Sequence, residues 1–219
     1  MTDLADIFTA WERGWAVARG IPLADPIDDG LRVRCDQATR EIEYFALHAD
    51  DDPPAIDRLA ALVLAERPVT WLTVPTLEPE RTVAALERAG LSLVLEAEQL
   101  MAVDLSAHPD RALDPRYTSE VSAADDVVEV LIHDASGAQA ARGYAGLDAD
   151  DAVADRILTE EGHRRRGLGG AVMSLLARTS LEQGTRRGLL VASEEGQLLY
   201  GALGWRPVAQ VVIAANRLA

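Results

Sequence analysis

The most constraining feature of the sequence is a strand that leads into a glycine-opened helix. Residues 157–184 read ILTEEGHRRRGLGGAVMSLLARTSLEQG. A strand is predicted to end at Thr159, and three glycines between residues 167 and 170 open a helix that ends at Gly184. A helix N-terminus presents unpaired backbone N–H groups and the positive end of the helix dipole, and glycine lets a large anion approach the main chain. The segment therefore predicts a site that holds a phosphate or a pyrophosphate.

Two common phosphate-binding motifs do not explain this segment. A P-loop requires the pattern GxxxxGK[ST], and the chain contains no lysine. The dinucleotide fingerprint GxGxxG follows an early strand of a parallel sheet. Here the helix follows an antiparallel meander of predicted strands at residues 117–121, 127–133, 138–147 and 152–159. The site is therefore expected to belong to another class of phosphate-binding protein.

Two motifs resemble the GNAT superfamily of acyl-CoA-dependent N-acyltransferases. The first is Arg164-x-x-Gly167-x-Gly169, which is similar to the family signature R/Q-x-x-G-x-G/A. The second follows a predicted strand at residues 188–192 and is similar to a family helix of pattern Asn-x-x-Ala-x-x-Leu-Tyr that ends in Leu-Gly-Phe. It matches at four positions and departs at three: Leu199, Tyr200, Leu203 and Gly204 match, whereas Ser193 replaces Asn, Gly196 replaces Ala and Trp205 replaces Phe. The resemblance covers about residues 117–219.

This resemblance implies an acetyl-CoA-dependent N-acetyltransferase in which an amine attacks the thioester directly, without a covalent enzyme intermediate. It assigns coenzyme A binding to ten positions: Leu158, Thr159, Arg164, Arg165, Arg166, Gly167, Leu168, Gly169, Gly170 and Ser193. The pyrophosphate is expected on the backbone amides of residues 164–170, and the pantetheine arm along Leu158 and Thr159. The N–H of Thr159 is expected to stabilise the oxyanion, and Tyr200 to protonate the departing thiolate.

The distribution of charge agrees with an anionic ligand at this segment. The whole chain carries a formal net charge of −15, from 36 acidic and 21 basic residues. Between residues 162 and 185, however, four arginines stand against the single acid Glu182. The overall acidity argues against nucleic acid and membrane surfaces as partners. Since every basic residue is an arginine, the acidity also fits a codon-composition bias of the lineage.

The chain is predicted to be an α/β protein, with α+β layers, in two halves. Residues 1–105 form an N-terminal α/β accessory domain, residues 106–116 a linker with two prolines, and residues 117–219 a GNAT-like domain with a mixed, mostly antiparallel sheet. In the first half, hydrophobic periodicity predicts helices at 4–18, 55–66 and 79–88 and strands at 31–35, 40–47, 69–74 and 91–105. This order of strands and helices allows the first half to be a diverged copy of the same fold.

Metal, disulfide and membrane functions find no support in the sequence. The single cysteine, Cys35, cannot form an internal disulfide and is expected to be a small buried residue. The four histidines lie far apart, so no metal site is predicted. The N-terminus lacks the basic start of a signal peptide, and the longest apolar run, residues 59–65, is too short to cross a bilayer. We expect a cytoplasmic protein.

The sequence does not single out the group that accepts the proton of the incoming amine. Four side chains are candidates by their strand positions: Glu129, His133, Asp155 and Glu160. Each also fits a surface or hairpin charge, and a water relay would need none of them. Three tryptophans are predicted to pack in the core or between the halves, where one could line the acceptor pocket: Trp11, Trp15 and Trp71. Ser193 also fits as an N-cap.

The expected acceptor is a primary amine of a small molecule or a peptide, bound on a side of the catalytic half that the first half covers. The oligomeric state is open between monomer and homodimer, and a longer acyl donor is an alternative to acetyl. A hypothesis from a different class of protein is a catalytically silent CoA-binding module with a regulatory or scaffolding role. The departures at Ser193 and Gly196 and the missing base motivate it.

Overall fold

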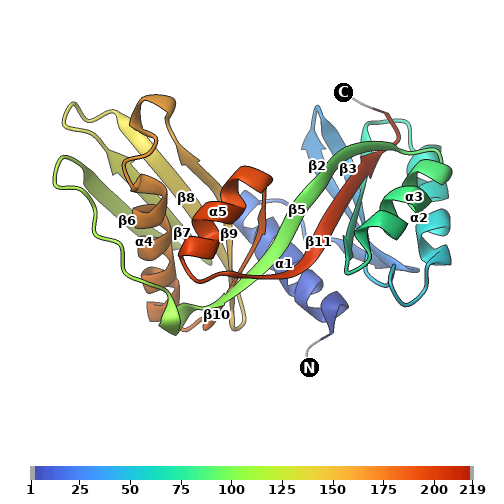
Figure 1. Cartoon of the computed structure of the whole chain (residues 1–219), viewed down its shortest axis with the longest axis horizontal. Coiled ribbons are helices and arrows are strands. Elements are labelled where there is room, and N and C mark those ends of the chain that lie inside the picture. The colour runs from blue at the N-terminus through green and yellow to red at the C-terminus, as the bar shows by residue number, and fades with distance from the viewer. Residues whose placement is uncertain (1–2, 218–219) are drawn as a thin grey trace.

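The computed structural model describes residues 3–217, apart from the side chain of Glu96, and these residues form one continuous sheet of eleven strands with helices on both faces (Figure 1). The helices are α1 (Leu4–Arg19), α2 (Pro54–Ala65), α3 (Pro79–Arg88), α4 (Leu168–Glu182) and α5 (Glu194–Ala202), and 3-10 turns span Leu105–Ala107 and Glu161–His163. The strands are β1 (Asp25–Ile27), β2 (Gly30–Gln37), β3 (Arg40–Ala46), β4 (Thr70–Thr76), β5 (Ser92–Asp104), β6 (Thr118–Ala124), β7 (Val127–His133), β8 (Gln139–Asp148), β9 (Asp151–Thr159), β10 (Arg187–Ala192) and β11 (Arg206–Ala215). Their order is β1-β2-β3-β4-β11-β5-β10-β9-β8-β7-β6. The predicted α/β class with a mostly antiparallel sheet is confirmed, and β1 is an additional strand.

Local sequence signals account for the ends of the helices. Gly20 ends α1 in the left-handed region, with φ of 62°, and its N–H bonds the carbonyl oxygens of Ala16 and Val17. Pro54 and Pro79 each stand in the first turn of a helix, where a missing N–H has no cost. No helix within residues 3–217 combines the length and apolar character that a bilayer crossing requires.

The two halves repeat one arrangement of strands and helices. The first half runs β3-α2-β4-α3-β5, and the second runs β9-α4-β10-α5-β11. In each half the first two of these strands are parallel neighbours, since β3 pairs with β4 and β9 pairs with β10. This common order confirms the predicted two-half arrangement.

Strand exchange joins the halves into a single sheet. Strand β5 of the first half pairs with β10 and β11 of the second, and β11 in turn lies between β4 and β5. Figure 1 shows β5 and β11 side by side as the long central strands that connect the two ends of the molecule. The predicted linker at residues 106–116 begins in the first 3-10 turn and otherwise lies outside helices and strands.

Helix α1 crosses from the first half to the sheet of the second. A Cβ atom at Gly146 of β8 would overlap the Gly14 carbonyl oxygen of α1 and lie 2.6 Å from the Ala18 nitrogen. On the other face of β8, a Cβ at Gly143 would meet Val172 of α4 at 2.5 Å. Helices α1 and α4 therefore cover opposite faces of the second half, although α1 lies in the first half by sequence.

We expect Gly146→Ala to lower the free energy of unfolding by about 3 kcal/mol, because the added methyl meets the backbone of α1 rather than a flexible side chain. Urea denaturation followed by tryptophan fluorescence measures the change. Gly162→Ala is the matched control, since a Cβ there has no atom of the described residues within 4 Å. Equal midpoints for both variants would contradict the close approach of α1 to β8.

Candidate active site

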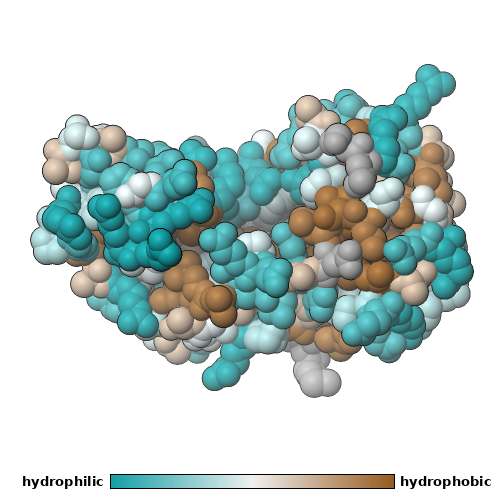
Figure 2. Space-filling model, turned by 45° about the horizontal axis from the view of Figure 1, so that its top comes forward, coloured by the Kyte–Doolittle hydropathy of each residue, from teal (hydrophilic) through white to brown (hydrophobic). Residues whose placement is uncertain are grey.

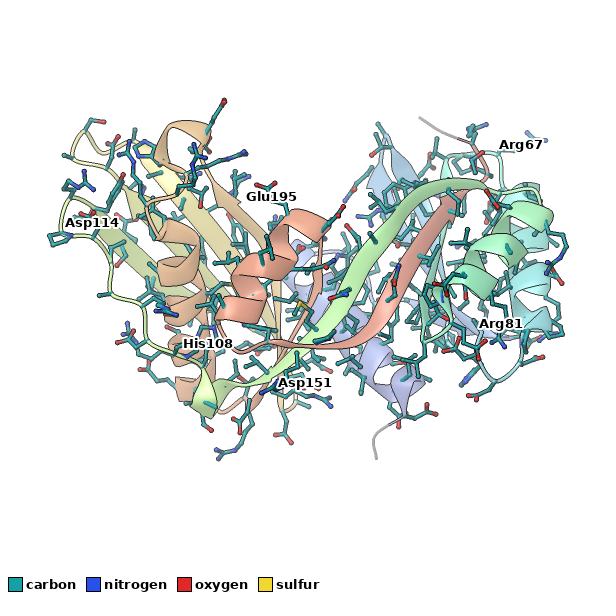
Figure 3. The ribbon with its side chains drawn as sticks, in the orientation of Figure 1. Arg67, Arg81, His108, Asp114, Asp151 and Glu195 are labelled. Carbon is teal, nitrogen blue, oxygen red and sulfur yellow. The ribbon has the colours of Figure 1, made fainter. Side chains whose placement is uncertain are left out.

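The parallel strands β9 and β10 part midway along their length. Their pairing runs from Asp151 opposite Arg187 to Val153 opposite Leu189, whereas β9 continues to Thr159 and β10 to Ala192. The paired end is held by a bidentate ion pair, in which the Arg187 guanidinium donates to the Asp151 carboxylate over 2.6 and 2.8 Å. In Figure 3, Asp151 lies at this end, and Glu195 on α5 lies toward the opposite, open end. The parting strands leave one edge of β9 without a neighbour.

A β-bulge in β9 shapes this free edge. Tyr144 of β8 pairs with Asp155 and Arg142 with Leu158, so two residues of β9 stand opposite one of β8, and Arg156 has φ of 52°. The Arg156 side chain donates to the Ala18 carbonyl oxygen at the end of α1. Because of the bulge, Asp155 and Ile157 face opposite sides of the sheet although they are two residues apart.

The N–H of Thr159 points into the gap between the parting strands. The next residue, Glu160, donates its own N–H to the Ala140 carbonyl oxygen of β8 over 2.9 Å. Neighbouring N–H groups of a strand point in opposite directions, so the N–H of Thr159 points away from β8. The Nε of Arg164 lies 3.4 Å from the Thr159 carbonyl oxygen on the same open side. Thr159 thus presents a free donor where the sequence predicts an oxyanion site.

The loop that enters α4 is built as the sequence predicts. Gly167 is the N-cap, with φ of 78° that favours glycine, and no described side chain caps the first N–H groups of the helix. Arg164 and Arg165 are exposed beside it, whereas the Arg166 guanidinium donates to the Tyr117 hydroxyl over 2.9 Å. Figure 2, which brings the top of the molecule forward, shows strongly hydrophilic side chains gathered on the half that carries α4. The helix mouth therefore combines free donors with positive charge.

Gly169 lies where β9, α4 and α5 meet. A Cβ at this position would be 3.0 Å from the Leu199 Cδ2 of α5 and 3.9 Å from the Thr159 hydroxyl. Leu168 and Gly170 are buried, so these two predicted positions offer a ligand their backbone rather than a side chain. The structure thus brings the predicted positions of β9 and α4 together at the open end of the strands.

Tyr200 lies on α5 and packs against Gly196, one turn earlier. A Cβ at Gly196 would come within 2.9 Å of the tyrosine Cε2, which explains why glycine replaces the alanine usual in the family motif. Burial, with a smaller contribution from the Asp155 carboxylate, raises the pKa of Tyr200 to about 12. No hydrogen bond to its hydroxyl occurs within residues 3–217. Ser193 is the predicted N-cap of α5, and its hydroxyl accepts from the Gly196 N–H over 3.3 Å.

A cavity of about 280 Å³ lies on the α1 face of the sheet, between the two halves. The second half contributes Ala154 and Asp155 of β9 and Val191 of β10 to its wall. The first half contributes α1, β3, β4 and β5, and all three tryptophans singled out by the sequence line it: Trp11, Trp15 and Trp71. The glycine-opened loop and this cavity therefore meet at the gap between β9 and β10 from opposite faces.

Two closed ion pairs occupy the cavity wall. Arg19 of α1 donates to both oxygens of Asp155 over 2.7 and 2.9 Å. Arg40 lies between the rings of Trp15 and Trp71, about 5 Å from each centroid, and donates to Glu43 over 2.9 Å. Glu43 of β3 is only 1% exposed, because helices cover both faces of the sheet in the first half.

Of the four candidate proton acceptors, only Asp155 lines the cavity. Glu129 is hydrogen-bonded to Tyr144, Glu160 is exposed, and His133 ends β7. Cys35 is buried, as the sequence predicts, and burial raises the pKa of its thiol to about 12. The described part of the chain holds no group of three or more metal-ligating side chains.

No family model and no curated protein matches this chain. Among solved structures, a GCN5-related N-acetyltransferase from Kribbella flavida aligns with a TM-score of 0.70 over 98% of this chain and 96% of its own, at 19% identity. The chain has the GNAT fold. A tandem GNAT protein from the clavulanic acid biosynthesis pathway aligns with a TM-score of 0.56 over 81% and 76% of the two chains, at 12% identity. A GCN5-related N-acetyltransferase from Sphaerobacter thermophilus aligns with a TM-score of 0.60 over 85% and 76%, at 12% identity.

The similarity to a tandem GNAT protein agrees with the repeat in this chain, whose eleven-stranded sheet is shared by two halves of the same strand and helix order. In the second half, the parted strands, the glycine-opened helix and Tyr200 occupy one GNAT unit. The first half contributes most of the cavity wall and has no second glycine-opened loop among the described residues.

Proposed function

We propose that the protein transfers an acetyl group from acetyl-CoA to a primary amine by direct attack. One observation carries this proposal: the gap between β9 and β10 has the glycine-opened N-terminus of α4 on one face and a cavity of about 280 Å³ on the other. A thioester in this gap would be reached from both sides. The fold, shared with acetyltransferases, supports the same activity.

On the donor side, the backbone N–H groups at the start of α4 would hold the pyrophosphate, and Arg164 and Arg165 would add positive charge. The pantetheine arm would lie along the free edge of β9 at Leu158 and Thr159. The N–H of Thr159 then faces the thioester oxygen and stabilises the charge that develops on it.

On the leaving-group side, Tyr200 would protonate the departing thiolate. The phenol is protonated at neutral pH, and its hydroxyl is not engaged by another described residue. The amine would enter from the cavity, so acceptor and acid stand on different sides of the gap.

Calorimetry with acetyl-CoA, followed by a thiol-release assay over a panel of primary amines, tests the proposal. We expect one binding event per chain and thiol release that depends on the amine. Acetylpantetheine, which lacks the pyrophosphate, is the matched donor control and should bind much more weakly. Binding without amine-dependent release would favour the catalytically silent CoA-binding module, and absence of binding would contradict both.

A further inference from the structure

One carboxylate of the cavity has no partner. Two acids of its wall are closed in ion pairs, Asp155 with Arg19 and Glu43 with Arg40. Glu98 of β5 also lines the cavity, yet it takes part in no ion pair or side-chain hydrogen bond among residues 3–217. A partly buried charge without a partner is costly, and a cationic ligand would remove that cost.

The strand exchange places Glu98 at the gap between the parting strands. Its neighbour Gln99 pairs with Ala192, the last residue of β10. Leu100, two residues on and therefore on the same face, is buried in the core beneath α1, so Glu98 faces the cavity. On the other face, Gln197 of α5 donates to the Ala97 carbonyl oxygen over 2.6 Å. Glu98 and α5, which carries Tyr200, therefore approach the end of β10 from opposite faces.

The surroundings of Glu98 also make it a stronger base than an ordinary carboxylate. Burial raises its pKa, the negative charge of Glu43 raises it further, and Arg40 partly offsets both effects. Asp155 is less suited to accept a proton, because Arg19 donates to both of its oxygens. Glu98 is thus the free carboxylate of the cavity.

We propose that Glu98, supplied by the non-catalytic half, binds the ammonium group of the acceptor and takes its proton, and that the acceptor is a small amine with a single positive charge. The proposal rests on the acetyltransferase function proposed above. The charge follows from the described side chains of the cavity: their two arginines are matched by two carboxylates, and one carboxylate remains. The volume of about 280 Å³ restricts the acceptor to a small molecule or one side chain.

Every proton of the proposed acetyl transfer is accounted for. The ammonium gives one proton to Glu98, and the freed nitrogen lone pair attacks the thioester carbon, which forms the N–C bond and moves the carbonyl electrons to oxygen. The C–S bond then breaks with its electron pair on sulfur. Sulfur takes the phenol proton of Tyr200, the phenolate takes the second proton from nitrogen, and Glu98 releases its proton to water. The net products are the amide, the thiol and one proton.

The variant Glu98→Gln tests this role with butylamine as the acceptor. We expect kcat to fall about 100-fold at pH 7 while acetyl-CoA affinity is unchanged. The loss should shrink as the pH approaches 10, because a neutral amine needs no base. Glu120→Gln, at an exposed acid of β6, is the matched control. The other charged groups that face Glu98 are those of Arg19, Arg40, Glu43 and Asp155.

Replacing butylamine by 4-aminobutanoate tests the charge of the acceptor. We expect kcat/KM to fall about tenfold, because the added carboxylate enters a cavity that already has an excess of negative charge. A preference for 4-aminobutanoate would overturn the assignment to a singly charged amine. If the wild type acetylates the amine but Glu98→Gln keeps the wild-type kcat, or loses activity equally at every pH, the role of Glu98 is overturned and the proposed function stands. Failure of the wild type to acetylate any amine would overturn the proposed function itself.

Discussion

Gly169→Val is expected to weaken acetyl-CoA binding at least about 100-fold, or ~2.7 kcal/mol. The new side chain would stand between the Leu199 Cδ2 and the Thr159 hydroxyl, in the space where the thioester arm must pass. Its backbone is not in the left-handed region, and the nearest atom is the flexible end of a leucine, so the variant should fold. Calorimetry with acetyl-CoA measures the effect.

Gly201→Val is the control for this variant. It places the same side chain in α5, where a Cβ meets no atom of the described residues within 4 Å, and acetyl-CoA affinity should stay within a factor of about two. Gly167→Val should also abolish binding, but it adds backbone strain at a φ of 78°. Full affinity in both Gly167→Val and Gly169→Val would remove the phosphate-binding assignment from this loop.

Tyr200→Phe is expected to lower kcat about 100-fold or more while leaving acetyl-CoA affinity nearly unchanged. The substitution removes only the hydroxyl, which has no hydrogen-bond partner among the described residues, so the change in unfolding free energy should stay within about 0.5 kcal/mol. Steady-state kinetics together with calorimetry separate the two effects. Equal losses of turnover and affinity would indicate a structural tyrosine instead of an acid.

The pH dependence of kcat is a second test of Tyr200 as the proton donor. Because burial raises the pKa of Tyr200 to about 12, the phenol remains a proton donor from neutral pH to above pH 10. Wild-type kcat should therefore show no loss from deprotonation of this group below about pH 11. An alkaline loss near pH 9 that disappears in Tyr200→Phe would contradict the stated environment of the phenol.

The first half differs from the second at the loop that follows its first parallel strand. Residues 47–53 read LHADDDP, so three aspartates stand where the second half has three arginines. The Asp50 carboxylate accepts from the Leu77 N–H over 2.7 Å and from the Thr76 hydroxyl over 2.5 Å. The donors at the end of β4 are therefore occupied by a carboxylate of the protein itself. Negative charge at this loop opposes the binding of a phosphate.

Local patterns in the chain were enough to predict the elements of the second half. The strands of the second half, the start of a helix at the glycines and the Ser193 cap each depend on interactions within a few residues, and all three predictions are confirmed. The departure at Gly196 could be seen in the sequence but not explained, since its cause is the ring of Tyr200 lying against it.

Contacts between segments far apart in the sequence decided how the two halves join and where the cavity lies. Strand β5 pairs with β10 more than eighty residues later, and this pairing alone brings Glu98 to the end of β10. Helix α1 docks on β8 because two glycines, Gly14 and Gly146, allow backbones to touch. Hydrophobic periodicity reports which face of an element is buried, but it carries no information about which partner buries it. The amino-acid order therefore specified the glycine-opened loop, whereas the cavity arose only when the two halves shared a sheet.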